Sequence, residues 1–197
     1  MFPGTHAATH PDKPAVIMAD SGASLTYGEL DARSAAVADA LREFGLRRGD
    51  VIALLSDNSA TAFEVYWAAL RSGLYVTAVN WHLAAEEAAY IVNDSGARVL
   101  FASAGIRALA EEVAELTPDV ERYFAFGGEM RGFEDYADLL DRTPQIPDSQ
   151  PRGTEMLYSS GTTGRPKGIK PRMVDTDVDE PGDPLVGMVQ HAFGFTA

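Results

Sequence analysis

The chain has 197 residues and a formal net charge of −13, and 46% of its residues are hydrophobic. This composition is typical of a folded globular domain and excludes extensive disorder. An acidic chain repels phosphate backbones, so we expect no nucleic-acid partner. The absence of cysteine excludes disulfides, thiolate metal sites and a cysteine nucleophile. We see no signal-peptide pattern and no apolar run of about 18 residues, so we expect a cytoplasmic protein without a membrane span.

Strands and helices are predicted to alternate along most of the chain. Thr26 and Glu29 have the spacing of a capping box, and apolar residues then recur at helical spacing until Gly45. The apolar run 51–55 is typical of a strand buried on both faces. The further predicted elements are a helix ending at Gly73, a strand over 75–79, a helix over 86–93, a strand over 98–102, a helix that Ser103 caps, a strand over 122–126 and a short helix over 133–140. This alternation predicts an α/β fold with a mostly parallel sheet flanked by helices.

Changes in composition divide the chain into four parts. We expect an α/β subdomain over 1–142, a proline-containing linker over 143–153, and a strand with a phosphate-binding loop over 154–170. The part over 171–197 is predicted to be an acidic loop followed by the start of a truncated subdomain. Its acidic residues lack the glycine and terminal glutamate of a calcium loop, so we interpret them as solvated. The last predicted helix, 185–195, stops within an apolar pattern, and an exposed apolar surface there would favour self-association.

The residues that carry chemistry lie in one segment, 158–168, which reads Tyr-Ser-Ser-Gly-Thr-Thr-Gly-Arg-Pro-Lys-Gly. Its glycines allow a ligand to approach the backbone closely, and its hydroxyls and amides can donate to oxyanions. Lys167 supplies a positive charge for a phosphate group. A flexible polar loop is the alternative interpretation, but this combination after a predicted strand favours phosphate binding. The candidate binding residues are Ser159, Ser160, Gly161, Thr162, Thr163, Gly164 and Lys167, and none is assigned a catalytic role.

The common P-loop of ATPases and kinases does not fit this segment. That loop needs a Ser or Thr directly after its lysine to bind Mg²⁺ at the start of a helix. Here Gly168 follows Lys167, and Pro166 and Pro171 disfavour a long helix beginning at the lysine. Binding is therefore expected to rest on loop amides, hydroxyls and the lysine.

The segment 158–169 closely resembles the phosphate loop of the adenylate-forming enzymes, which include acyl-CoA synthetases, luciferases and the adenylation domains of peptide synthetases. The resemblance extends over about residues 10–170, through the segments 25–31, 48–54, 69–73, 85–87 and 90–98. The residues Gly161-Thr162-Thr163-Gly164 and the segment 80–83 are more similar to fatty-acyl-CoA ligases than to peptide-synthetase domains. The chain thus resembles the N-terminal part of the large domain of such a ligase.

The resemblance implies a two-step reaction. A carboxylate, here that of a fatty acid, attacks the α-phosphorus of Mg·ATP to give acyl-adenylate and pyrophosphate, and the thiol of coenzyme A then displaces AMP. The loop would hold the β- and γ-phosphates, with Thr162 contributing to the Mg²⁺ site and Lys167 pairing with phosphate. The family segments for adenine and ribose and the small C-terminal domain are not found, so the chain alone is expected to be inactive.

The sequence also departs from the family after the loop, where Lys170-Pro171-Arg172-Met173 replaces an apolar strand and a Thr-His pair. Two other functions stay open. One is an adenylate-forming enzyme for an aryl or amino acid, and the other is a non-catalytic nucleotide-binding or interaction module.

Overall fold

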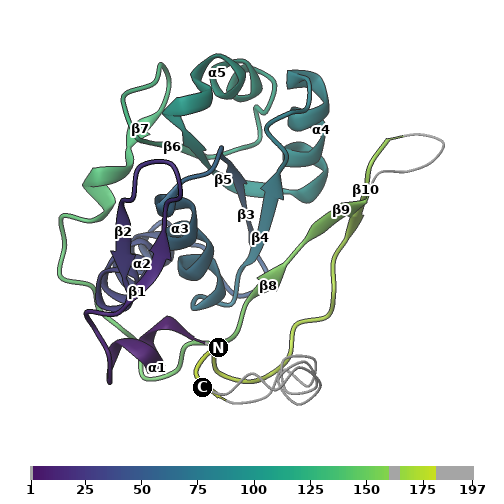
Figure 1. The fold of residues 1–197 in the computed structure, drawn as a ribbon. Helices are drawn as coiled ribbons and strands as arrows, with labels where there is room; N and C mark the ends of the chain where they lie inside the picture. Colours follow the sequence, from purple (N-terminus) through teal and green to yellow (C-terminus); the bar gives the residue numbers. More distant parts are fainter. Residues whose placement is uncertain (1, 160–164, 181–197) are drawn as a thin grey trace, which may run out of the picture.

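The computed structural model describes residues 2–159 and 165–180, and its centre is a parallel sheet with helices on both faces (Figure 1). The strand order is β7-β6-β5-β3-β4-β8, and every neighbouring pair is parallel. This architecture confirms the predicted α/β class. The strands are β3 (Val51–Leu55), β4 (Tyr75–Val79), β5 (Ala97–Ser103), β6 (Arg122–Phe126), β7 (Glu134–Asp135) and β8 (Thr154–Glu155).

Two helices cover each face of this sheet. The helices α2 (Tyr27–Glu43) and α3 (Ala60–Leu70) lie on one face, and α4 (Ala85–Ser95) and α5 (Arg107–Glu115) lie on the other. Side chains of β3 alternate between the two cores: Ile52 and Leu54 pack with α2 and α3, whereas Ala53 and Leu55 pack with α4 and α5. Because both faces are covered, the strand needs apolar residues at every position.

The order of the strands explains why the helices divide between the faces. β4 and β5 pair with opposite sides of β3, so the chain reverses direction across the sheet after β4. Right-handed crossovers in opposite directions place their helices on opposite faces. The helix α3 therefore lies on one face, and α4 and α5 lie on the other.

The ends of the helices follow from local hydrogen bonds. The capping box of α2 is confirmed: the Thr26 hydroxyl accepts from the Glu29 amide at 3.2 Å, and the Glu29 carboxylate accepts from the Thr26 amide at 2.9 Å. The helix α4 has Ala84 at its cap, and Glu87 accepts from the Ala84 amide at 3.2 Å. Gly96 ends α4 with φ of 70°, which glycine adopts without a steric cost.

Some predictions of elements were wrong or incomplete. The predicted helix over 133–140 is instead the short strand β7 followed by the 3₁₀ helix η2 (Tyr136–Leu139), because Asp135 caps a tight turn by accepting from the Ala137 amide at 2.9 Å. Ser103 likewise caps the 3₁₀ turn η1 (Ala104–Ile106) rather than α5 itself. The chain also begins with elements that were not predicted, namely α1 (Pro3–Ala7) and the antiparallel pair β1 (Pro14–Ile17) and β2 (Ser24–Thr26).

The single strand predicted at the start of the segment 154–170 is divided into two strands by Met156. The first is β8 at the edge of the main sheet, and the second is β9 (Leu157–Ser159), which pairs with β10 (Lys167–Ile169). The segment that leads to β8 is held against the domain, since the Gly153 amide donates to the Leu70 carbonyl at 2.7 Å. The four-part division of the chain stays a prediction. Within residues 2–159 and 165–180, no helix is long and apolar enough to cross a membrane.

Candidate functional site

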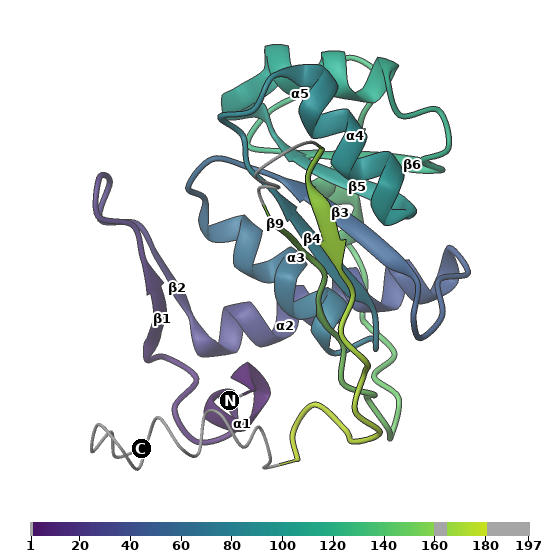
Figure 2. The ribbon, with the colours of Figure 1, turned by 90° about the vertical axis from the view of Figure 1, so that its right-hand side faces the viewer.

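The predicted phosphate loop is carried by the antiparallel hairpin of β9 and β10 (Figure 2). Ser159 pairs with Lys167, Tyr158 pairs with Gly168, and Leu157 pairs with Ile169. The fold thus brings the candidate residues Ser159 and Lys167 opposite each other on the two strands that flank the loop. The candidates Ser160, Gly161, Thr162, Thr163 and Gly164, with the predicted Mg²⁺ contribution of Thr162, lie outside the described residues.

The direction of the hairpin follows from its attachment to the sheet. β8 runs parallel to β4 and pairs with its first two residues, Tyr75 and Val76, and the Met156 amide donates to the Val76 carbonyl at 3.0 Å. β9 continues from this point alongside α4 (Figures 1 and 2). The hairpin therefore points toward the carboxyl end of the parallel strands, which is where open α/β sheets bind their ligands.

Two cationic side chains follow residues 160–164 in the sequence. Arg165 and Lys167 are both exposed, and the Arg165 guanidinium lies 5.1 Å from the centre of the Tyr90 ring. Among the described residues, the Lys167 ammonium takes part in no ion pair. An exposed lysine without an ion-pair partner among the described residues, opposite the exposed Ser159, is suited to contact a phosphate group.

The described part of the chain contains no group of three His, Asp or Glu side chains that could hold a metal ion. Mg²⁺ at a nucleotide keeps several waters and phosphate oxygens as ligands, and it needs few protein ligands. A site of that kind does not require a cluster of carboxylates.

One contact of the hairpin was not predicted from the sequence. The Tyr158 hydroxyl donates to the Asp94 carboxylate of α4 at 2.7 Å. Burial, together with this hydrogen bond, raises the pKa of Tyr158, so the hydroxyl stays protonated and remains a donor at neutral pH. The two residues are 64 positions apart, and no local pattern in the sequence indicates such a pair.

The chain beyond β10 is held at the amino end of the sheet. The Tyr75 hydroxyl donates to the Pro171 carbonyl at 2.7 Å, and the Lys170 ammonium lies 4.6 Å from the Tyr75 ring. Arg48 donates to the Val174 carbonyl at 2.7 Å and pairs with Asp175 at 3.1 Å. The segment that departs from the family pattern thus runs back along the domain after the loop.

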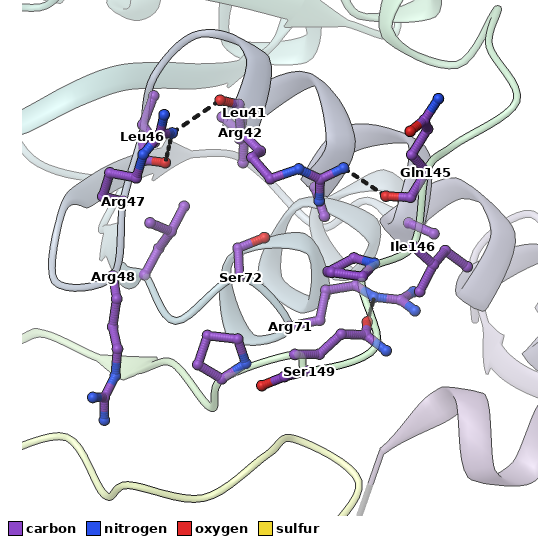
Figure 3. A pocket seen from close by; sticks show the side chains of 16 residues that line it. Leu41, Arg42, Leu46, Arg47, Arg48, Arg71, Ser72, Gln145, Ile146 and Ser149 are labelled. Carbon is purple, nitrogen blue, oxygen red and sulfur yellow. Dashed lines mark hydrogen bonds between the residues drawn. The ribbon is translucent and has the colours of Figure 1, made fainter.

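A cavity of about 320 Å³ lies beside the segments 46–48 and 71–74, which lead into β3 and β4 at the amino end of the sheet; Figure 3 shows the side chains that line it. Its wall is formed by α2, the end of α3 and the segment 145–151. Arginines line it, but Arg42 donates to the Gln145 carbonyl, and Arg71 donates to the Gln150 amide oxygen at 2.8 Å and pairs with Asp31 at 2.9 Å. These guanidinium groups hold the linking segment on the domain, so the cavity is separate from the phosphate-loop site.

The chain is thus an α/β protein in which an antiparallel hairpin beside the parallel sheet carries the glycine- and hydroxyl-containing segment. The family model of the AMP-binding enzymes matches residues 4–171. The chain belongs to this family, as the resemblance of the loop and its flanking segments predicted.

Similar proteins are acid ligases of this family. The chain is 36% identical over 165 residues to a fatty acid–[acyl-carrier-protein] ligase, ScoC, from Streptomyces coeruleorubidus, covering 83% of this chain and 31% of the relative. It is 33% identical over 162 residues to a 3-hydroxybenzoate–CoA ligase from Aromatoleum sp., covering 80% of this chain and 31% of the relative. The crystal structure of a protein assigned as a long-chain-fatty-acid CoA ligase from Rhodopseudomonas palustris superposes with a TM-score of 0.79 at 26% identity, covering 98% of this chain and 47% of that one. The chain thus spans about a third of the length of these curated relatives.

Proposed function

We propose that the full-length protein containing this chain uses ATP to activate a carboxylic acid as its adenylate and then transfers the acyl group to a thiol. The observation that carries this proposal is the pairing of Ser159 with Lys167 at the two ends of the loop sequence. Membership of the AMP-binding family and the similarity to acid ligases support the same reaction.

In this proposal the chain binds the β- and γ-phosphates of ATP. Lys167 offers a point charge to the β- or γ-phosphate, and the Ser159 hydroxyl on the opposite strand offers a hydrogen bond. The loop residues Ser160, Gly161, Thr162, Thr163 and Gly164 add amides and hydroxyls, and Thr162 contributes to the Mg²⁺ site. Positive charge at this place stabilises the pyrophosphate that leaves when the carboxylate attacks the α-phosphorus.

For the substrates we propose a fatty acid and coenzyme A. The fatty acid–[acyl-carrier-protein] ligase among the relatives supports an aliphatic acid. A second candidate is an aryl acid, which the 3-hydroxybenzoate–CoA ligase supports at nearly the same identity. Turnover of the full-length protein with fatty acids of graded length and with hydroxybenzoates distinguishes the two, because the preferred class should show the higher kcat/KM.

The replacement Lys167→Ala tests the phosphate role. We expect the adenylation half-reaction to slow by about ten- to a hundredfold, because a charge-assisted bond contributes about 1.5–3 kcal/mol. Thioester formation from supplied acyl-adenylate should change much less, since pyrophosphate has already left. The rates of the two half-reactions are measured separately by pyrophosphate release and by thioester formation.

The matched control is Lys170→Ala. Lys170 is also exposed and lies three positions further along, but its ammonium faces the Tyr75 ring. Adenylation should keep its wild-type rate in this variant. Equal loss in both half-reactions of the Lys167 variant, or equal loss in both lysine variants, would contradict a specific phosphate contact.

A further inference from the structure

Two side chains of α4 contact the phosphate-loop hairpin, one on β9 and one just before β10. The Tyr158 hydroxyl, on β9, donates to Asp94 Oδ2 at 2.7 Å. The Arg165 guanidinium, just before β10, lies 5.1 Å from the centre of the Tyr90 ring. The Tyr90 hydroxyl also donates to Asp94 Oδ1 at 3.4 Å, which joins the two contacts. We call these four residues, Tyr90, Asp94, Tyr158 and Arg165, the α4 clasp.

The spacing on the helix explains why one element can hold both strands. Tyr90 and Asp94 are four residues apart, so they lie on the same side of α4 one turn from each other. Tyr158 precedes the loop and Arg165 follows it, so the contacts lie on both of its flanks. The contacts thus join α4 to the hairpin on both sides of residues 160–164.

Outside the clasp, the hairpin is attached to the domain near its base, where the Tyr75 hydroxyl donates to the Pro171 carbonyl after β10 and the Tyr158 ring packs against the core under α4. Leu157 and Ile169 are 58% and 55% exposed, and Lys167 and Gly168 are also exposed. The backbone bond from Met156 to Val76 lies at the base of the hairpin, before β9 begins. The clasp adds contacts with α4 on both sides of residues 160–164.

Gly168 gives the tyrosine the space it needs. It pairs with Tyr158 across the hairpin, and a Cβ at this position would lie 3.0 Å from both Cζ and the hydroxyl oxygen of Tyr158. It would also lie 2.8 Å from Cε of Met156. A larger residue at position 168 would displace the ring from its path to Asp94.

We propose that α4 positions the phosphate loop through this clasp, with Asp94 and Tyr90 as positioning residues that hold Ser159 and Lys167 in place for the nucleotide. The inference rests on the proposed function for its effect on catalysis, although the clasp itself is a matter of geometry. A preorganised loop loses less conformational freedom when it binds, and this lowers the KM for ATP.

The test uses the full-length protein with Tyr158→Phe and Asp94→Ala, which each remove the hydrogen bond. We expect the KM for ATP to rise about three- to tenfold in both, with a much smaller change in the KM for the acid. The double variant should be no worse than either single variant, because both remove one interaction. Asp94→Asn should restore most of the wild-type KM, since its amide oxygen can still accept from Tyr158.

The matched control is Tyr123→Phe. The Tyr123 hydroxyl donates to the Thr117 carbonyl beyond the end of α5, away from the hairpin. Its loss should leave the KM for ATP unchanged. A similar rise in the KM of this control would mean that the effect is one of general stability, and it would overturn the proposal.

Hydrogen exchange of the amides in residues 157–169 provides a readout that needs no activity. We expect faster exchange in the Tyr158→Phe and Asp94→Ala variants than in the wild type and in Tyr123→Phe. If the wild type activates no acid but these amides exchange faster in the two variants, the proposed function fails while the clasp stands. If exchange and KM are both unchanged, the clasp is overturned while the ligase function is untouched.

Discussion

Glu64 is a buried carboxylate in the helix layer that α2 and α3 form. Its side chain is 1% exposed, it accepts from the Tyr136 hydroxyl at 2.8 Å, and it pairs with Arg33 at 3.1 Å. Burial raises the pKa of Glu64 above its ordinary value, although both hydrogen-bond partners act in the opposite direction. Sequence periodicity placed α3 correctly but gave no sign that this glutamate points inward.

Replacing Glu64 by glutamine should change how stability depends on pH. The folded protein binds the Glu64 proton more tightly than the unfolded chain, so the wild type loses stability as pH rises through the interval from the ordinary to the raised pKa. The glutamine side chain of the Glu64→Gln variant does not titrate but can still accept from Tyr136. The free energy of unfolding of Glu64→Gln relative to wild type should therefore increase across this interval.

Urea unfolding at several pH values between about 4 and 8 measures this difference. The control is Glu112→Gln on the exposed side of α5, which should follow the wild-type profile. A constant difference between Glu64→Gln and wild type at every pH would show that Glu64 does not titrate in this interval.

The Thr26 side chain caps the start of α2. Thr26→Ala removes the hydroxyl that accepts from the Glu29 amide, and we expect a loss of about 1 kcal/mol in the free energy of unfolding. Thr26→Ser keeps the acceptor and should lose only a few tenths of a kcal/mol. Thermal or urea unfolding of both variants checks this, and equal losses would assign the effect to the methyl group instead of the cap.

At the scale of the element, β8 joins the phosphate-loop hairpin to the sheet, and Gly153 directly precedes it. A Cβ at this position would lie 2.8 Å from the Ala69 carbonyl oxygen and closer still to the Leu74 carbonyl oxygen. Backbone atoms cannot move away as a flexible side chain can. The approach of residue 153 to the end of α3 and the start of β4 thus requires glycine.

Gly153→Ala should lower the free energy of unfolding by about 2–3 kcal/mol, because of overpacking against backbone. Gly22→Ala is the control, since a Cβ there meets nothing within 4 Å and only the φ of 70° opposes it. This control should lose about 1 kcal/mol. If the free energy of unfolding fell by the same amount in both variants, the close packing around Gly153 would not account for the loss.

Elements were predictable from the sequence where the pattern is local. The run 51–55 predicted β3, and Thr26 with Glu29 predicted the start of α2, because apolar periodicity and capping act over a few residues. The strands β1 and β2 were missed since they are short and only partly buried. The 3₁₀ helix η2 was mistaken for an α-helix because Tyr136 and Leu139 are buried at a spacing that both helices share.

The candidate site was predictable only where its residues form a local pattern in the sequence. Gly, Ser, Thr and Lys within one short segment indicate phosphate binding without knowledge of the fold. The register between β9 and β10 determines the pairing of Ser159 with Lys167. The packing position of α4 determines the contact of Tyr158 with Asp94. Such long-range placement has no signature in a single sequence.

At the scale of the whole molecule, the chain forms a three-layer α/β unit with the phosphate-loop hairpin at one edge of its sheet (Figure 1). It spans about a third of the curated relatives, so the acid, adenine and thiol contacts of the proposed reaction are expected largely outside it. The predicted helix over 185–195 lies outside the described residues, and the self-association that it implied stays a prediction.

We propose above that this chain binds the phosphates of ATP in an acid-activating enzyme. Exchange of labelled pyrophosphate into ATP by the full-length protein tests it most directly, because it reports formation of the adenylate without need of a thiol acceptor. We expect exchange that requires both Mg²⁺ and a carboxylic acid and that falls by about tenfold or more in Lys167→Ala. Absence of exchange with every fatty and aryl acid, in a protein that is folded and binds ATP, would contradict it and favour a non-catalytic nucleotide-binding module.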